Sequence, residues 1–488
     1  MKKNKYALQR IKVVCLCFAS VLLSCENLEE NPTSFISPNN FYQTIGQGET
    51  ALAASLSAIW NEWSNYGYSY GYQFFKHADD QMNYRDLIIP ADKGDYLWRG
   101  HYTALLNINA VLKSIRENRM EGEQEEIDIL VGQAKFLRAY NYFMLVRLFG
   151  GVPLYTDENE DPTSNPLARS SISEVYDLIT SDLIEAQSKL PVQWPDKPGR
   201  ITKYAASTLL AKVYITMATA PLNATENYAN ARDVALTIIN AGDSPYGLQE
   251  NVHDVFKKEN KFGKEMIWSF QSNSEDVQTS ANIWGPGEMG GWSDCISNAF
   301  FEESWPEQPR KEAYLLTELV LDDGSILPYQ EWGAQSPACK KYMMPYITIE
   351  EWNSYVSYAN FPILRYPEVL LIFAEAENMV NNGPTQAAVE AINQVIDRAN
   401  GWEENPNYPR VTLAMSAEEF DDAVIRERNF ELCFEFDRYF DLIRKRILDV
   451  VNPETIENFS EDDYLFPIPQ LDLAENPLLT QNPGYPSP

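Results

Sequence analysis

The residues best suited to acid–base chemistry are Glu431 and Glu435, which lie in a stretch rich in charged residues. Two neighbouring carboxylates could serve as the acid and the nucleophile of a glycoside hydrolase. The charges recur at steps of three and four, which stacks opposite signs on one helix face. They belong to Arg426, Arg428, Glu431, Glu435, Arg438, Asp441 and Arg444. Because neighbouring arginines keep a carboxylate ionised, and a general acid needs a raised pKa, the pattern favours a structural ion-pair network.

The sequence contains few residues that could bind a metal ion or a cofactor. The three histidines stand singly, and we expect packed or surface roles for His77, His101 and His253. Cys295, Cys339 and Cys433 lack the close spacing of a zinc site, and Cys295 and Cys339 could either pair or remain free thiols. No serine-hydrolase elbow, phosphate loop or dinucleotide fingerprint occurs. We therefore expect no catalytic residue, no metal site and no cofactor.

Aromatic side chains give the stronger indication of a ligand. A flat indole or phenol ring can stack on the apolar C–H face of a sugar, and it loses little conformational freedom on binding. Trp284 and Trp292 lie among glycines without helical periodicity, so we expect both rings to be exposed. Trp332 and Tyr66 are second candidates because they lie in other irregular stretches.

Two charged residues could complete such a site. Arg85 and Asp86 follow an aromatic loop and could hydrogen-bond sugar hydroxyls, although ordinary surface charges need no such role. For every aromatic residue the competing interpretation is a place in the core. That interpretation is the better one for Trp98, which precedes Tyr102 and Leu105 at helical spacing.

Helical periodicity predicts a mainly α-helical framework around these residues. We expect helices at residues 39–60, 94–115, 123–149, 173–190, 202–218, 227–241, 367–380 and 387–399. Gly150-Gly151 and Gly383-Pro384 interrupt the pattern, as helix ends require. Small residues such as Ala374 and Ala388 would let paired helices approach closely. The arrangement is typical of degenerate tetratricopeptide-like hairpins, each of which buries its apolar face only against its neighbours.

Residues 252–362 depart from this pattern. Glycine, proline and aromatic residues are crowded there, and helical periodicity is weak. The tryptophans of the segment are Trp268, Trp284, Trp292, Trp305, Trp332 and Trp352. We interpret it as a large irregular, aromatic-rich insertion that faces a ligand, because long loops on a rigid scaffold often carry binding specificity.

The first 25 residues predict export and a lipid anchor. A basic start without acidic residues precedes an apolar run at residues 13–23, which has the length of a signal-peptide core and is too short to span a bilayer. The run ends in Leu22-Leu23-Ser24-Cys25, which resembles the lipobox of bacterial lipoproteins. That resemblance implies cleavage before Cys25 and acylation of its thiol. The alternative is a plain secretory signal with a chance cysteine.

Composition narrows the possible partners. The chain has 488 residues, 44% of them hydrophobic, which is enough for a sizeable core. Its formal net charge of -31 repels phosphate backbones, so we exclude nucleic acid as a partner. After the signal, no apolar run is long enough for a transmembrane helix.

Five stretches carry a more specific resemblance. They read QAKFLRAYNYFMLVRLFGGVPLY at 133–155, GRITKYAASTLLAKVY at 199–214, FPILRYPEVLLIFAEAEN at 361–378, IRERNFELCFEFDRYFDLIRKR at 425–446 and YLFPIPQLDLAENPLLTQNPGY at 464–485. Together with the lipobox they resemble the RagB/SusD family of outer-membrane nutrient-binding lipoproteins of the Bacteroidetes. One departure is Phe436-Asp437-Arg438, where family members often carry Gly-His-Arg; we expect this position to lie in a framework helix.

The resemblance implies a curved framework of tetratricopeptide-like hairpins and a surface-exposed, non-catalytic binding protein. It also implies a SusC-type TonB-dependent outer-membrane channel as partner, to which the protein delivers a captured oligosaccharide. The acidic residues Glu26, Glu29 and Glu30 resemble the family's surface-export signal, although a merely solvated tether would look the same.

We therefore divide the chain into five parts. Residues 1–24 form the signal peptide and 25–38 a lipidated acidic tether; residues 39–251 form an N-terminal helical part, 252–362 the irregular insertion and 363–488 a C-terminal helical part. The expected function is capture of an oligosaccharide at the outer membrane. The same architecture binding peptides is one alternative, and a secreted glycoside hydrolase is another.

Overall fold

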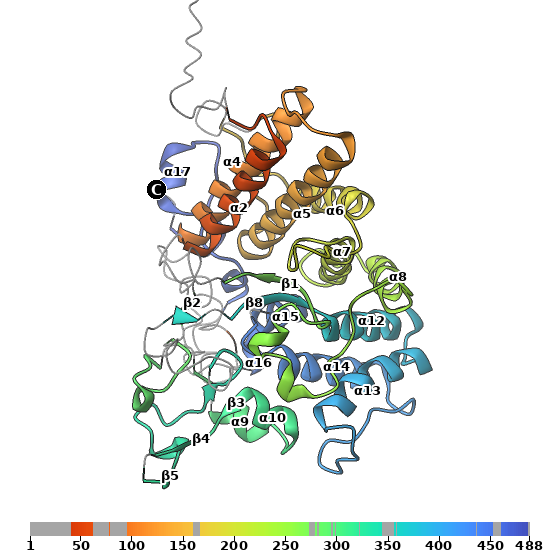
Figure 1. Ribbon diagram of the computed structural model, residues 1–488, viewed down its shortest axis with the longest axis vertical. Coiled ribbons are helices and arrows are strands. Elements are labelled where there is room, and N and C mark those ends of the chain that lie inside the picture. The colour runs from red at the N-terminus through yellow and green to blue at the C-terminus, as the bar shows by residue number, and fades with distance from the viewer. Residues whose placement is uncertain are drawn as a thin grey trace, which may run out of the picture.

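The long amphipathic helices expected from the sequence are present in the computed structural model (Figure 1). The structure describes residues 41–61, 78, 95–159, 166–272, 279–280, 283–293, 296–297, 299–321, 323–343, 356–357, 359–435, 437–451 and 460–486. Cys25, Tyr66, His77, Arg85, Asp86 and Cys295 lie outside these ranges. No helix in the described ranges combines the length and the apolar character that a membrane span requires.

The N-terminal helices pack in chain order. They are α2 (Ile45–Asn61), α4 (Asp95–Arg116), α5 (Gln124–Phe149), α6 (Ile172–Lys189), α7 (Lys203–Met217) and α8 (Asn227–Ile239). Consecutive members contact each other from α4 to α8, and α2 lies on both α4 and α5 (Figure 1). Because α5 has neighbours on several sides, its second half is buried around the helix, and its rings Phe136, Tyr142 and Phe143 are inaccessible.

The helix ends follow their local sequence. Ser171 caps α6 by accepting a hydrogen bond from the backbone N–H of Glu174, whose carboxylate accepts one from the backbone N–H of Ser171 in return. Gly150 ends α5 with a φ of 74°, a conformation that other residues rarely adopt.

The C-terminal helices form a second group. They are α12 (Tyr366–Asn381), α13 (Gln386–Ala399), α14 (Ala417–Leu432), α15 (Arg438–Lys445), α16 (Leu448–Val451) and α17 (Gln470–Glu475). Helix α12 packs on α13, α14 and α8, and so joins the two groups. Ala374 and Ala388 are fully buried, as close approach of α12 and α13 requires. Helix α17 lies beside α4, where the indole N–H of Trp98 donates to Asp472 at 2.9 Å (Figure 1).

Short strands begin and end the irregular segment. Strand β1 (Met266–Phe270) pairs antiparallel with β8 (Phe361–Arg365), and Phe270 lies opposite Phe361. Between them lie three shorter antiparallel pairs: β2 (Thr279–Ser280) with β7 (Val356–Ser357), β3 (Leu315–Leu316) with β6 (Ala338–Cys339), and β4 (Glu318–Val320) with β5 (Ile326–Pro328). Helices α9 (Ala299–Ser304) and α10 (Pro309–Tyr314) are short. The β1–β8 pair therefore holds both ends of a long, irregular excursion.

The structure agrees with the predicted mainly helical fold and differs in two places. The helix expected at residues 39–60 begins only at Ile45. The charged stretch at 426–444 was expected on one continuous helix, but α14 ends at Leu432 and α15 begins at Arg438. Phe434 lies in the break with a φ of 63°, and Asp437 precedes α15. The departure from the family motif at Asp437 therefore lies at a helix junction and not inside a helix.

The C-terminal motif closes onto the end of α5. The side-chain amide of Asn482 donates to the carbonyl oxygens of Phe149 at 3.1 Å and Phe466 at 2.7 Å. Phe466 in turn donates its backbone N–H to the carbonyl of Leu148 at 2.7 Å. Segments more than 300 residues apart therefore meet through backbone groups that would otherwise be buried without partners.

Candidate functional site

Among the predicted ligand residues that the structure describes, Trp292 is the accessible one. Its side chain is 57% exposed and extends from a tight loop at residues 285–293. Within the loop, Ser293 donates its backbone N–H to Gly285 and Gly291 donates to Pro286, both at 3.0 Å. A Cβ atom on Gly291 would lie 2.1 Å from the Gly285 carbonyl oxygen, so the loop closes this tightly only with glycine.

A side chain ties the Trp292 loop to a neighbouring turn. The carboxylate of Glu288 accepts a hydrogen bond from the backbone N–H of Gly333 at 2.7 Å. The hydroxyl of Ser293 also accepts one from the backbone N–H of Gly287 at 3.0 Å. An exposed indole on a braced loop is preorganised for stacking, because little freedom remains to be lost on binding.

Trp284 and Trp332, two of the predicted ligand residues, are in the core. Trp284 is 4% exposed because Tyr342 and Phe361 pack on its ring, with centroids 4.6 and 6.3 Å away. Trp332 is 1% exposed, and its indole N–H donates to the carbonyl of Leu327 at 3.1 Å. Neither ring has a free face for a sugar, so the exposure expected for Trp284 was wrong, and the choice of Trp332 as a second candidate is not supported. The core position predicted for Trp98 is confirmed.

The other predicted residues are either outside the described ranges or cysteines that could have formed a disulfide or bound a metal. Tyr66, Arg85 and Asp86 lie outside the described residues, as does Cys25, and their roles stay predictions. Cys339 and Cys433 are buried free thiols, and Cys295 lies outside the described residues. Within the described ranges, no cluster of three or more His, Cys, Asp or Glu side chains is placed to hold a metal ion.

Glu431 lies at the centre of a buried ion network and not in a cleft. Its carboxylate accepts hydrogen bonds from Arg398 at 2.6 Å and from Arg365 and Arg310 at 3.0 Å each. Burial alone would raise its pKa, but the three guanidinium groups outweigh burial and hold the pKa well below its ordinary value. A carboxylate in this state cannot donate a proton to a leaving group.

Glu435 belongs to the same network. It is held by Lys341 and by Arg365, whose Nε lies 2.6 Å from the carboxylate. The network therefore has the structural character expected from the charge pattern, but with different partners. Its cations come from distant elements: Arg310 from α10, Arg365 from β8 and Arg398 from α13. Of the arginines close in sequence, Arg428 and Arg444 pair with other acids.

Those sequence neighbours form a second buried network. Arg444 holds Glu375 at 2.6 Å and Asp441 at 2.8 Å, while Arg428 reaches Asp441 at 2.8 Å and Glu368 at 3.3 Å. Only the Asp441–Arg444 pair has the spacing of three that the helical pattern suggested. The rest are contacts between helices, which periodicity within one helix could not reveal.

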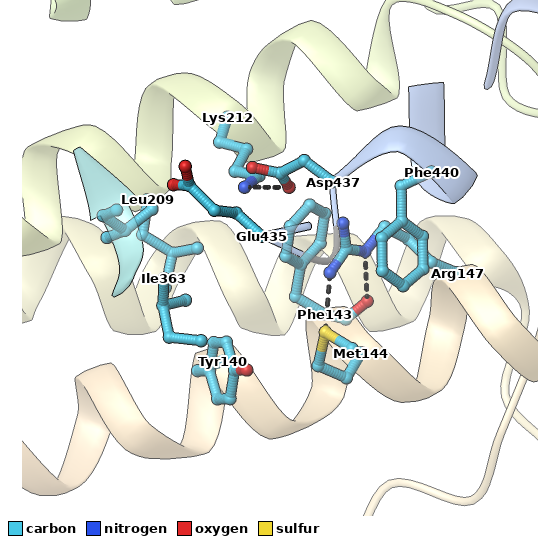
Figure 2. A pocket seen from close by; sticks show the side chains of 11 residues that line it. Tyr140, Phe143, Met144, Arg147, Leu209, Lys212, Ile363, Glu435, Asp437 and Phe440 are labelled. Carbon is cyan, nitrogen blue, oxygen red and sulfur yellow. Dashed lines mark hydrogen bonds and ion pairs between the residues drawn. The ribbon is translucent and has the colours of Figure 1, made fainter. Parts of the chain in front are cut away.

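A small cavity beside these networks, lined by both charged and apolar side chains, is too small to bind a ligand (Figure 2). It lies among Arg147 of α5, Lys212 of α7, Glu435 and Asp437, with Phe440 along one wall. Lys212 contacts Asp437 and, at 2.9 Å, Glu368, while Arg147 lies over the rings of Phe143 and Phe440. Its volume of about 20 Å³ accommodates about one water molecule. These charges hold helices together.

Comparison with known proteins accounts for most of the chain. Residues 250–485 match the model described as the SusD family, and residues 28–215 match one described as starch-binding associating with outer membrane. SusD-like protein P2 of Formosa agariphila is 26% identical over 98% of this chain and 100% of its own length.

Solved structures share the fold. A SusD homolog from Bacteroides thetaiotaomicron superimposes with a TM-score of 0.81 at 22% identity, covering 92% of this chain and 98% of its own. Surface glycan-binding protein A from Bacteroides uniformis gives 0.73 at 20% identity, covering 90% and 99%. The two family models together cover the irregular segment and all but α8 of the long helices, and the chain belongs to the SusD/RagB family.

Proposed function

We propose that this protein captures an oligosaccharide at the outer membrane without cleaving it and delivers it to a SusC-type TonB-dependent channel. The family descriptions name starch binding and association with the outer membrane, and one structural neighbour is named a surface glycan-binding protein. These descriptions support a carbohydrate ligand and an outer-membrane location.

The observation that carries the proposal is the geometry of Trp292. A large apolar ring that is 57% exposed has an energetic cost in water, and the glycines and Glu288 hold it in place. Stacking against a sugar would remove that ring from water while the hydroxyls of the sugar stay solvated. A shallow contact of this kind gives micromolar to millimolar affinity, about 4 to 8 kcal/mol, which suits capture followed by release.

A hydrolase receives no support from the described carboxylates. Glu431 and Glu435 are buried and ion-paired, and the pKa of Glu431 is shifted away from that of an acid catalyst. The purified protein should therefore leave its glycan intact.

Calorimetric titration against a panel of glycans and peptides tests the ligand class. We expect heat on addition of at least one glycan, and chromatography of the mixture should recover the glycan at its original chain length. Binding of peptides alone would overturn the carbohydrate assignment, and shortened products would overturn the non-catalytic one.

The anchor and the channel need separate tests. Palmitate labelling in a Bacteroidetes host should mark the wild-type chain and spare Cys25→Ala, because Cys25 is the cysteine that ends the predicted lipobox. A tagged chain extracted from outer membranes with detergent should retain a large β-barrel channel. Equal labelling of both chains, or recovery of the protein without a channel, would contradict these parts of the proposal.

A further inference from the structure

Helices α4 and α17 border a pocket of about 370 Å³, which we call the α4–α17 pocket. The two helices lie side by side in Figure 1. The volume lies within the roughly 300 to 1,000 Å³ that is usual for binding sites. The apolar lining includes Trp98, Tyr102, Leu105 and Leu106 of α4 and Leu479 beyond α17. The residues of the Trp292 loop do not line this pocket, so it is a separate feature.

The charged side chains that line the pocket are both acidic among the described residues. They are Asp472 and Glu475, which lie three residues apart in α17 and therefore share one face of the helix. Asp472 accepts its hydrogen bond from the neutral indole of Trp98, and no described cation forms an ion pair with either carboxylate. Burial raises the pKa of Asp472, and the bond from Trp98 offsets part of this rise. The neighbouring charges of Asp95 and Glu475 raise that pKa again, as expected for acids that lack a nearby cation.

Two arginines near the pocket do not neutralise it. Arg169 is close enough to act on Tyr102, but its guanidinium donates to the backbone carbonyls of Gly151, Phe149 and Thr480 at 2.6 to 2.9 Å. Arg99 follows Trp98 in α4, and its guanidinium lies 5.4 Å from the ring centre of Tyr96. Neither arginine lines the pocket. The described residues therefore leave its negative charge uncompensated.

Exposed leucines lie beside the two acids. Leu106 lines the pocket and is 40% exposed. Leu471, directly before Asp472, is 62% exposed, and Leu478, directly before Leu479, is 50% exposed. Exposed apolar side chains that gather in one place are typical of interaction sites. Because this apolar surface continues past the pocket, it is larger than a small amine could cover.

We propose that the α4–α17 pocket docks a basic, apolar segment of a partner protein. A lysine or arginine side chain would enter it with the alkyl stem against Tyr102 and Leu106 and the charged head at Asp472 and Glu475. Leucine-like side chains on either side of that residue would cover the exposed leucines. The formal net charge of -31 also attracts a basic segment toward this protein. The proposal does not depend on the nature of the captured oligosaccharide.

One pair of variants tests the charge. Asp472→Asn combined with Glu475→Gln removes both negative charges, and the asparagine can still accept the hydrogen bond from Trp98. The control combines Glu403→Gln with Glu404→Gln, which removes two charges from an exposed loop outside the pocket. Both double variants change the net charge of the protein equally.

A second pair of variants tests the position. Leu106→Arg places a cation in the pocket, where it would compete with the incoming basic side chain. Ile184→Arg is the control, because Ile184 is 52% exposed on α6 and does not line the pocket. Circular dichroism melting curves show which variants keep the fold.

The probe is a short fluorescent peptide that alternates leucine and lysine, measured by fluorescence anisotropy on the full mature chain at physiological ionic strength. One comparison peptide has serine in place of each leucine, and another has glutamate in place of each lysine. We expect only the leucine–lysine peptide to bind. The pocket double variant and Leu106→Arg should each weaken that binding about tenfold or more, since charge-assisted contacts are lost. Both controls should bind as the wild type does.

Several results would overturn the proposal. Equal weakening in the two double variants would assign the binding to overall charge, and equal binding of the serine peptide would leave the leucines without a role. Displacement of the peptide by an equal concentration of butylamine would assign the pocket to a small amine. Binding of the glutamate peptide, or no binding at all, would also exclude it. Failure of the proposed function is a separate result, because it appears as a loss of oligosaccharide binding, which these variants should leave unchanged.

Discussion

Arg398 of α13 donates to Glu431 of α14 at 2.6 Å in an interior where both side chains are inaccessible to water. Arg398 also reaches Glu265, just before β1, at 3.0 Å. The pair therefore connects the C-terminal helices to the strand at which the irregular segment begins. Its role is to position that segment, which carries the exposed ring of Trp292.

Replacing Glu431 should destabilise the whole fold. Glu431→Gln leaves three buried guanidinium groups short of one negative charge, and breaking a buried pair in this way costs about 3 to 5 kcal/mol. Urea unfolding followed by circular dichroism measures the loss. The control is Glu418→Gln on the exposed part of the same helix, which should change stability by less than about 0.5 kcal/mol. A stable Glu431→Gln protein would contradict the structural role.

Removal of the exposed ring should affect binding and spare stability. Trp292→Ala should weaken oligosaccharide binding about ten- to a hundredfold, or 1 to 3 kcal/mol, because one stacking surface is lost. Calorimetric titration and thermal melting give the two readouts. Trp402 is 51% exposed elsewhere, so Trp402→Ala should leave affinity unchanged. Equal affinity of Trp292→Ala and wild type would remove Trp292 from the site.

Trp332→Ala should show the opposite pattern. The ring is 1% exposed, and truncation of a buried tryptophan costs about 3 to 5 kcal/mol of folding stability through the cavity that it leaves. We expect a clear fall in the urea midpoint, while protein that remains folded should keep the affinity of the wild type. A selective loss of affinity at unchanged stability would restore Trp332 as a ligand residue.

His101 should make stability depend on pH. Burial lowers its pKa from 6.5 to about 4, and its Nδ1 lies 2.8 Å from the Asn141 oxygen. The unfolded chain therefore binds the proton more readily than the folded protein does. Above about pH 7 His101 is neutral in both states and contributes nothing to the pH dependence of folding stability. Stability falls as the pH drops from about 6.5 to 4, by up to about 3 kcal/mol.

The test compares wild type with His101→Gln, whose amide can still donate to Asn141. Urea unfolding at pH 7.5, 6, 5 and 4 should show a smaller loss of stability in the variant, since the carboxylates are common to both proteins. Parallel stability curves for the two proteins would show that His101 is not the group that titrates.

Much of the framework could be predicted from local patterns. The expected helices at 94–115, 123–149 and 387–399 agree with α4, α5 and α13 to within one or two residues. Their apolar spacing and end signals are properties of the chain itself, so no distant contact is needed to recognise them. The break between α14 and α15 was not predicted. Glu431 and Glu435, on either side of its start, pair with arginines from other elements, and helical spacing within one stretch gives no sign of such contacts.

The sequence by itself determined the helical framework and the family, because periodicity and motifs are encoded by residues close together in the chain. The tertiary structure alone decided which tryptophans are accessible. Trp284 and Trp292 lie among similar glycines, yet Tyr342 and Phe361 cover the first and leave the second exposed. It also brought Trp98, Leu106 and Asp472 together around one pocket. Exposure and cavities depend on segments far away in sequence, whose packing the local pattern does not specify.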